Sequence, residues 1–109
     1  MTTIALEKEW IETAKLFGDV KNIVKEALRV YAIQQCQQRI ENATAKVEVF
    51  RRKYQCDHEK FKKSIQTDSS FLQEIESTNP MWEQDAIEWE YWLEEQETWR
   101  NQLTTILHH

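Results

Sequence analysis

The chain has 109 residues, of which 40% are hydrophobic and 30% are charged, and its net charge is −5. This length predicts one domain, or a small domain with a protruding arm. Two cysteines are too few for a disulfide framework, and no apolar run has the length of a membrane span or of a signal-peptide core. We therefore expect a cytoplasmic protein that does not associate with membranes.

Charge is distributed unevenly along the chain. Residues 1–55 hold 10 lysines and arginines against 7 acidic residues, whereas residues 56–109 hold 4 against 12. A basic first half and an acidic second half suggest two partners of opposite charge; the alternative is that the charges only solvate helix faces. The single glycine and single proline predict few turns and long elements.

The N-terminal third predicts a short element followed by two helices. Residues 2–6 alternate polar and apolar side chains, which predicts a strand with Ile4 and Leu6 on one face, or else the first turn of the next helix. Residues 7–17 carry apolar side chains at helical spacing: Trp10, Ala14 and Phe17. Gly18 is then expected to stop this helix and Asp19 to cap a second one. The second helix has the apolar stripe Ile23, Ala27, Val30 and Tyr31.

A heptad pattern follows in the middle of the chain. Its positions alternate steps of four and three: Cys36, Ile40, Ala43, Val47, Phe50, Tyr54, Asp57 and Phe61. This spacing is typical of a coiled-coil seam, and the absence of a helix breaker between residues 19 and 64 predicts a long helix. Asp57 is the one polar residue in the seam, and it could cap a new helix if the chain bends near Gln55.

Turn signals divide the C-terminal third. Residues 67–70 predict a loop, with Ser70 and Gln73 at the spacing of a capping box. A short helix follows, and Asn79 is then expected to cap the last helix, with Pro80 at its first position. This last helix has one broad apolar face: Trp82, Trp89, Trp92, Trp99, Leu103 and Ile106. The predicted fold is therefore mainly α, with a possible N-terminal strand, and three segments: 1–33, 34–66 and 67–109.

Motifs that together touch most of the chain resemble those of a known family. Ile4-Ala5-Leu6, the stop at Phe17-Gly18 and the run Ile23-Val24-Lys25-Glu26-Ala27-Leu28-Arg29-Val30-Tyr31 are similar to a ribbon-helix-helix unit. Phe50-Arg51-Arg52-Lys53-Tyr54 and the tryptophan-rich stretch from residue 82 to residue 92 resemble the arm of small prokaryotic antitoxins of type II toxin–antitoxin modules, although Gln55 stands where relatives often have a glycine.

The resemblance implies two functional regions. Residues 1–33 would form a homodimer and contact operator DNA, and thereby autoregulate the operon, through four residues: Thr3, Ala5, Lys21 and Lys25. Residues 56–107 would bind and neutralise a basic toxin, expected to be a ribonuclease. The expected toxin-binding residues are Trp82, Asp85, Glu88, Trp89, Trp92, Glu95 and Trp99. Large aromatic side chains at such a surface would be the main source of affinity.

Two other functions remain open at this stage. A helical scaffold would pair its heptad seam with a second copy and would need neither toxin nor DNA. A ribonuclease is also conceivable, because Arg52 and His58 have the spacing of the Arg-x5-His signature and so resemble HEPN ribonucleases. Otherwise the sequence indicates no enzyme. Cys56, His58 and Cys36 are too few for a metal site, and we expect no cofactor and no small-molecule substrate.

Overall fold

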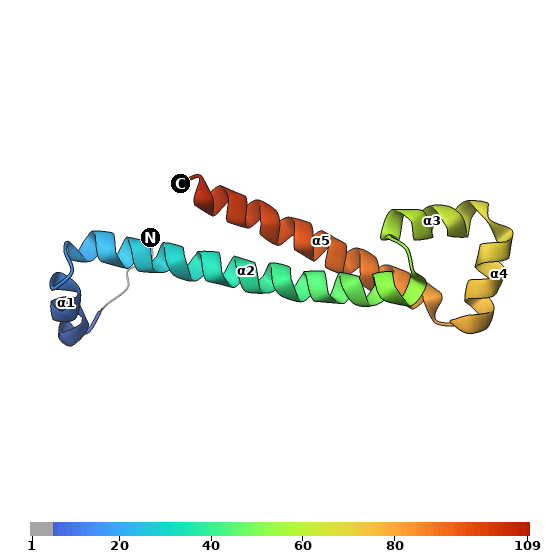
Figure 1. The fold of residues 1–109 in the computed structure, drawn as a ribbon. Helices are drawn as coiled ribbons and strands as arrows, with labels where there is room; N and C mark the ends of the chain where they lie inside the picture. The colour runs from blue at the N-terminus through green and yellow to red at the C-terminus, as the bar shows by residue number, and fades with distance from the viewer. Residues whose placement is uncertain (1–5) are drawn as a thin grey trace.

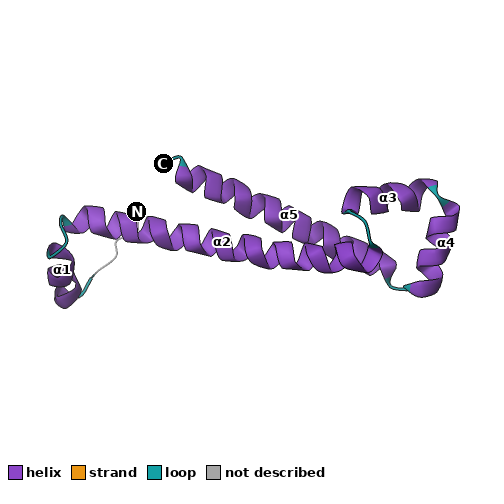
Figure 2. Ribbon diagram, in the orientation of Figure 1, coloured by secondary structure: helices purple, strands orange, loops and turns teal. Residues whose placement is uncertain are grey.

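Helices account for nearly all of residues 6–109, which are the residues described by the computed structural model of the chain (Figures 1 and 2). Within this range there are five helices and no strand: α1 (Lys8–Lys15), α2 (Val20–Tyr54), α3 (His58–Thr67), α4 (Ser69–Thr78) and α5 (Trp82–Leu107). The expected mainly helical fold with one long helix is therefore confirmed. The possible strand over residues 2–6 lies outside the described range except for Leu6, which precedes α1.

An antiparallel hairpin of α2 and α5 forms the body of the molecule, which measures 68 × 26 × 24 Å (Figure 1). The start of α5 lies beside the end of α2, and Ile106 near the end of α5 reaches Tyr31. The N-terminal turns of α2, together with α1, therefore project beyond the end of α5 (Figure 1). None of the helices within residues 6–109 combines the length and the apolar character that a membrane span requires.

The heptad seam of α2 packs against α5 of the same chain. Cys36, Ala43 and Phe50 are one heptad apart and are all buried, with exposed fractions of 3%, 1% and 7%. Tyr54 closes this series at the end of the helix. The seam is thus occupied within one chain, and α2 continues without interruption across residue 33.

The chain bends sharply after Tyr54. Gln55 adopts the left-handed conformation, with φ of 55°, and Asp57 begins the next helix by accepting a hydrogen bond from the Lys60 backbone N–H at 2.8 Å. The bend near Gln55 is therefore present without a glycine, and Asp57 is a helix cap where the heptad pattern placed it in the seam. Basic residues in the last turn of α2 face the negative end of the helix dipole.

The caps of α4 and α5 differ from those expected. The N-cap of α4 is Asp68, whose Oδ1 accepts hydrogen bonds from the backbone N–H groups of Ser70 and Phe71, both at 3.1 Å. The capping box expected at Ser70 is therefore wrong by two residues. The helix expected to begin at Asn79-Pro80 begins instead at Trp82, whose backbone N–H donates to the Asn79 carbonyl at 3.0 Å.

The N-terminal helix also ends earlier than expected. Its last hydrogen bonds run from the backbone N–H groups of Leu16 and Phe17 to the carbonyls of Thr13 and Ala14. Gly18 then takes φ of 138°, a conformation that favours glycine. Asp19 stands at the N-cap position of α2, as expected, but its side chain makes no capping hydrogen bond.

The core lies at one end of the molecule, where α2, α3, α4 and α5 meet. It consists of five buried residues: Phe50, Tyr54, Phe61, Ile75 and Trp89. The radius of gyration of 22.0 Å far exceeds the value of about 13 Å for a compact chain of about 100 residues. Most of the long hairpin therefore has only one layer of packing, and its outer faces remain exposed.

Candidate partner-binding surface

Trp89, at the centre of the predicted toxin-binding surface, is fully buried, with an exposed fraction of 0%. Its indole ring stacks on Phe50 and Tyr54, each at a centroid distance of 5.9 Å, and contacts Phe61 at 5.5 Å. Among residues 6–109 the indole N–H finds no hydrogen-bond partner. The side chain is therefore part of the core and is not accessible to a partner in this structure.

The other tryptophans of α5 are half-buried against neighbouring helices. Trp82 packs on the core, and Trp92 lies below the Lys46 ammonium group, which is 5.9 Å from the ring centroid. The Trp99 ring stacks under the guanidinium group of Arg39 at 4.5 Å, and its indole N–H donates to the Glu95 carboxylate at 2.8 Å. Most of the predicted aromatic surface thus holds the hairpin together.

Asp85 links the start of α5 to the end of α2. One of its carboxylate oxygens accepts hydrogen bonds from Lys53 Nζ and from the Tyr54 hydroxyl, both at 2.6 Å. Burial by itself would raise the pKa of Asp85, but the two hydrogen bonds outweigh it and lower the pKa below its usual value. Burial and the same carboxylate raise the pKa of Tyr54 well above its usual range. Asp85 therefore serves the fold, and its charge is already paired.

A different face of α5 is free. Five residues at steps of four and three lie on its outward side, and we name them the acidic stripe: Glu83, Ile87, Glu90, Glu94 and Glu97. All five are exposed, and Ile87 is 70% exposed. Glu88, from the predicted set, is also exposed, but it lies with the half-exposed Tyr91 and with Trp92 at a groove between α5 and α2 and is not part of this stripe.

The acidic residues that the sequence interpretation assigned to partner binding are Asp85, Glu88 and Glu95, and none of them belongs to the acidic stripe. Its signal was present: a second set of residues with heptad-like spacing, rotated away from the tryptophan face. Within residues 6–109, none of its four glutamates forms a salt bridge with a lysine, arginine or histidine. The stripe therefore presents unneutralised negative charge around one exposed aliphatic side chain.

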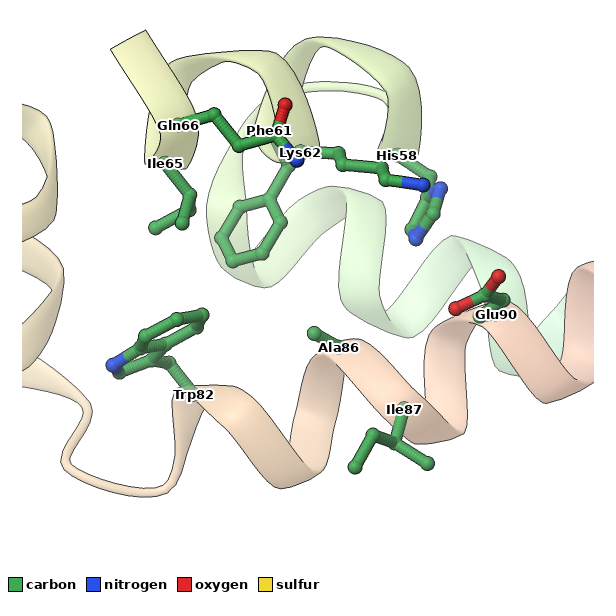
Figure 3. Close-up of a pocket in the computed structure, with 9 residues that line it drawn as sticks. All are labelled: His58, Phe61, Lys62, Ile65, Gln66, Trp82, Ala86, Ile87 and Glu90. Atoms are coloured by element: carbon green, nitrogen blue, oxygen red, sulfur yellow. The ribbon is translucent and has the colours of Figure 1, made fainter. Parts of the chain in front are cut away.

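A cavity of about 160 Å³ opens between α3 and α5, next to the acidic stripe (Figure 3). Phe61 from α3 and Trp82 from α5 pack against each other, with ring centroids 6.3 Å apart, and form its apolar wall together with Ile65 and Ala86. Polar side chains and Ile87 form the rim: His58, Lys62, Gln66, Ile87 and Glu90. Ile87 and Glu90 thus belong both to this rim and to the stripe.

The N-terminal end carries more exposed apolar side chains than the rest of the described chain, on more than one face of α1 and α2; we name six of them the N-terminal apolar residues: Trp10, Leu16, Phe17, Leu28, Val30 and Tyr31. Leu16 and Phe17 are each 79% exposed. The predicted DNA contacts Lys21 and Lys25 are also exposed in this region. Thr3 and Ala5 lie outside the described residues.

The residues of the Arg-x5-His pattern take part in other interactions. Arg52 pairs with Glu48 at 3.2 Å, and His58 packs with its ring edge-on to Trp89 at 5.3 Å. Hydrogen bonding, first from Arg51 and then from Arg52, lowers the pKa of Glu48 to about 2. Burial raises the pKa of the Cys56 thiol. Among residues 6–109 there is no group of three potential metal ligands.

Comparisons of the chain with protein-family models, with curated proteins and with solved structures gave no match.

Proposed function

We propose that the chain is a non-enzymatic antitoxin, which binds and neutralises a basic toxin through the acidic stripe of α5. The observation that supports this most directly is the exposure of the stripe's four glutamates around Ile87, with no intramolecular partner for their charge among the described residues. Compared with the surface expected from the sequence, the proposed site is rotated around α5 from the tryptophan face to the outward face.

Electrostatics favour a basic partner. Helix α5 carries seven carboxylates and a single basic residue, Arg100. A ribonuclease toxin has to bind phosphates and therefore needs a positively charged cleft. An acidic helix can enter such a cleft, speed the encounter by long-range attraction and exclude the RNA substrate. Neutralisation then requires no chemistry from the antitoxin itself.

The N-terminal apolar residues support a homodimer. Each of the six is at least 43% exposed in the structure of residues 6–109, and so many exposed apolar side chains at one end of a small protein favour an interaction surface there. Residues 6–31 contain five basic and five acidic side chains, so two copies meet there without net repulsion. The acidic stripe, in contrast, would repel a second copy of itself.

Operator DNA is the second proposed partner of the N-terminal end. Lys21 and Lys25 are exposed on the first turns of α2, where they can contact phosphates in the dimer. Asp19 and Glu26 lie close to them in the sequence and oppose this attraction. The proposed DNA affinity is therefore weak and should fall steeply with salt.

The antitoxin proposal can be tested by capture and growth together. The tagged chain is expressed in its source organism, and proteins that remain bound at stoichiometric amounts are identified by mass spectrometry. We expect one small basic protein that arrests growth when produced alone and permits growth when the chain is co-produced. Replacing Glu90, Glu94 and Glu97 by lysine should abolish both capture and rescue, because attraction becomes repulsion.

A matched control makes the same charge change elsewhere. Glu7, Glu9 and Glu12 are all exposed at the N-terminal end, and their replacement by lysine should leave capture and rescue intact. If no growth-arresting protein is recovered, or if both triple variants rescue growth equally well, the acidic stripe does not neutralise a toxin.

The scaffold alternative depends on the heptad seam of α2 pairing with a second copy. Cys36, Ala43 and Phe50 in that seam are already buried against the rest of the chain. Self-association through the seam would require α5 to detach, so this alternative has less structural support than the antitoxin proposal.

A further inference from the structure

The cavity between α3 and α5 has the size and lining of a receptor for one apolar side chain (Figure 3). Its volume of about 160 Å³ is close to the roughly 150 Å³ of an engineered apolar cavity that holds a benzene molecule. Its walls are the buried Phe61 and the half-buried Ile65, Trp82 and Ala86, so a guest side chain would cover the apolar surface that these three still expose to water.

We propose that this cavity anchors a single aliphatic side chain, such as leucine or methionine, from a helix of the basic partner. This inference rests on the antitoxin function proposed above and specifies how the partner is recognised. The acidic stripe would attract and align the partner helix, and the cavity would fix its position along α5. Apolar anchors on one face of a helix that docks into a groove are a recurrent mode of peptide recognition.

The acidic stripe and the cavity are continuous, so a side chain bound in the cavity would lie next to the glutamates of the stripe. Glu90 and Ile87 belong to both, so a helix that runs along the stripe passes the mouth of the cavity. Glu94 and Glu97 continue the same face by further turns. Lysines or arginines of the partner, one turn to either side of its anchor, would then face glutamates of the stripe.

The opposite rim restricts the orientation of the partner. Lys62 and His58, both from α3, line the rim across from Glu90 (Figure 3). Lys62 would repel a cation placed on that side, so the basic residues of the partner have to lie over α5. The site therefore selects an amphipathic helix with cations on one flank of its apolar anchor. A second copy of this chain does not satisfy that requirement with α5, which has seven carboxylates and one arginine.

Two synthetic peptides test the inference. Both are alanine-based helices of about 20 residues with lysines placed three, four and seven residues from a central position, which is leucine in one peptide and serine in the other. Binding to the full chain is measured by fluorescence anisotropy of the labelled peptide. We expect the leucine peptide to bind at least about ten-fold more tightly, because burial of a leucine side chain supplies that difference.

Variants of α5 test the contributions of the cavity and of the acidic stripe to peptide binding separately. Ala86→Leu fills the cavity without altering a charge, and should bring the affinity for the leucine peptide down to that for the serine peptide. Thr98→Leu adds similar bulk at an exposed position of the same helix and should preserve the preference. The triple replacement of Glu90, Glu94 and Glu97 by lysine should weaken both peptides together. Circular dichroism establishes that each variant retains its helices.

The outcomes distinguish the two proposals. Equal binding of the two peptides by the wild-type chain, or a preference that persists in the folded Ala86→Leu variant, overturns the cavity inference and leaves the acidic stripe as a binding surface. If neither peptide binds even at low salt, the stripe does not recognise basic helices, and the antitoxin proposal loses its support as well.

Discussion

Replacement of Trp89 by alanine tests whether this tryptophan belongs to the core. A large aromatic side chain buries about 150–250 Å², which at about 25 cal mol⁻¹ Å⁻² corresponds to about 4–6 kcal/mol. Trp89 is fully buried and contacts three aromatic rings of the core. Measured costs of truncating buried tryptophan or phenylalanine are about 3–5 kcal/mol, so we expect a loss of about 4 kcal/mol in the free energy of unfolding.

Trp89→Phe provides a second, sharper comparison. The indole N–H is buried without an acceptor, and leaving such a donor unpaired costs about 1–3 kcal/mol. Phenylalanine removes that donor while keeping most of the ring contacts, so its cost should stay below about 2 kcal/mol. Ile87→Ala, on the exposed face of the same helix, should change stability by no more than about 0.5 kcal/mol.

Urea denaturation followed by circular dichroism measures these differences. The chain concentration has to be held constant among variants, since dimerisation would contribute to stability. A loss of less than about 1 kcal/mol in Trp89→Ala would refute the assignment of this residue to the core. Because the variant is expected to be destabilised, any loss of partner binding in it reports a disturbed fold and gives no evidence that Trp89 touches the partner.

Three further predictions concern single residues that the fold depends on. Asp85→Asn should lower stability at neutral pH by about 1–3 kcal/mol, because charge-assisted hydrogen bonds are lost. The pKa of Asp85 is lower in the folded chain than in the unfolded chain, so its ionised carboxylate stabilises the fold fully above the unfolded pKa. This stabilisation is lost as the pH falls through the folded pKa. The free energies of unfolding of the wild-type chain and of Asp85→Asn should therefore converge as the pH falls below about 4. Gln55→Gly should raise stability by about 0.5–1 kcal/mol, because glycine relieves the left-handed backbone; an unchanged denaturation midpoint would contradict this. Asp68→Ala should cost about 1 kcal/mol while Ser70→Ala costs little, and the reverse order would restore Ser70 as the cap.

Periodicity predicted which side of α2 is buried, but it did not predict what covers that side. Cys36, Ala43 and Phe50 were expected to lie on one seam, and all three are buried. The same spacing suits a second copy or another helix of the same chain, since apolar side chains lack directional pairing rules. The covering element is α5, which occupies the seam antiparallel to α2. That choice depends on the bend at Gln55, which puts the following helices on the return path.

The bend itself had only a weak sequence signal. Glycine is the usual residue for a left-handed helix end, and position 55 is glutamine. Asp57 was the remaining signal, as a polar residue in an otherwise apolar seam that could start a new helix. Its capping hydrogen bond to Lys60 in the structure explains why the seam ends at Tyr54.

Several residues of the predicted partner-binding surface are engaged in packing for a related physical reason. Tryptophans at helical spacing mark a face that avoids water, and in a thin hairpin that face is needed to hold two helices together. Trp99 illustrates this, because both its ring and its indole N–H are engaged by Arg39 and Glu95. The accessible side of α5 is therefore the opposite one, where the sequence has glutamates and one isoleucine.

The carboxylates of α5 form hydrogen bonds or ion pairs on the face toward α2, whereas those on the outward face form no ion pair within residues 6–109, and this difference matters for the proposed function. Asp85 pairs with Lys53 and Tyr54 across the hairpin, whereas the glutamates of the acidic stripe pair with no basic residue within residues 6–109. Like charges three or four residues apart, such as Glu90, Glu94 and Glu97, each destabilise a helix by about 0.2–0.5 kcal/mol. The free chain therefore retains a repulsion that a cationic partner would relieve, so binding should also stabilise α5.

The effect of salt distinguishes an acidic stripe that binds a cationic partner from one that is only solvated. Added salt screens the repulsion within the acidic stripe and should raise the unfolding temperature of the free chain slightly. The same salt should weaken capture of a basic partner, because it screens the attraction. A solvated stripe with no partner would show only the first effect. Thermal unfolding of the free chain and capture measured over the same range of salt concentration should therefore change in opposite directions, and capture that is insensitive to salt would contradict recognition by charge.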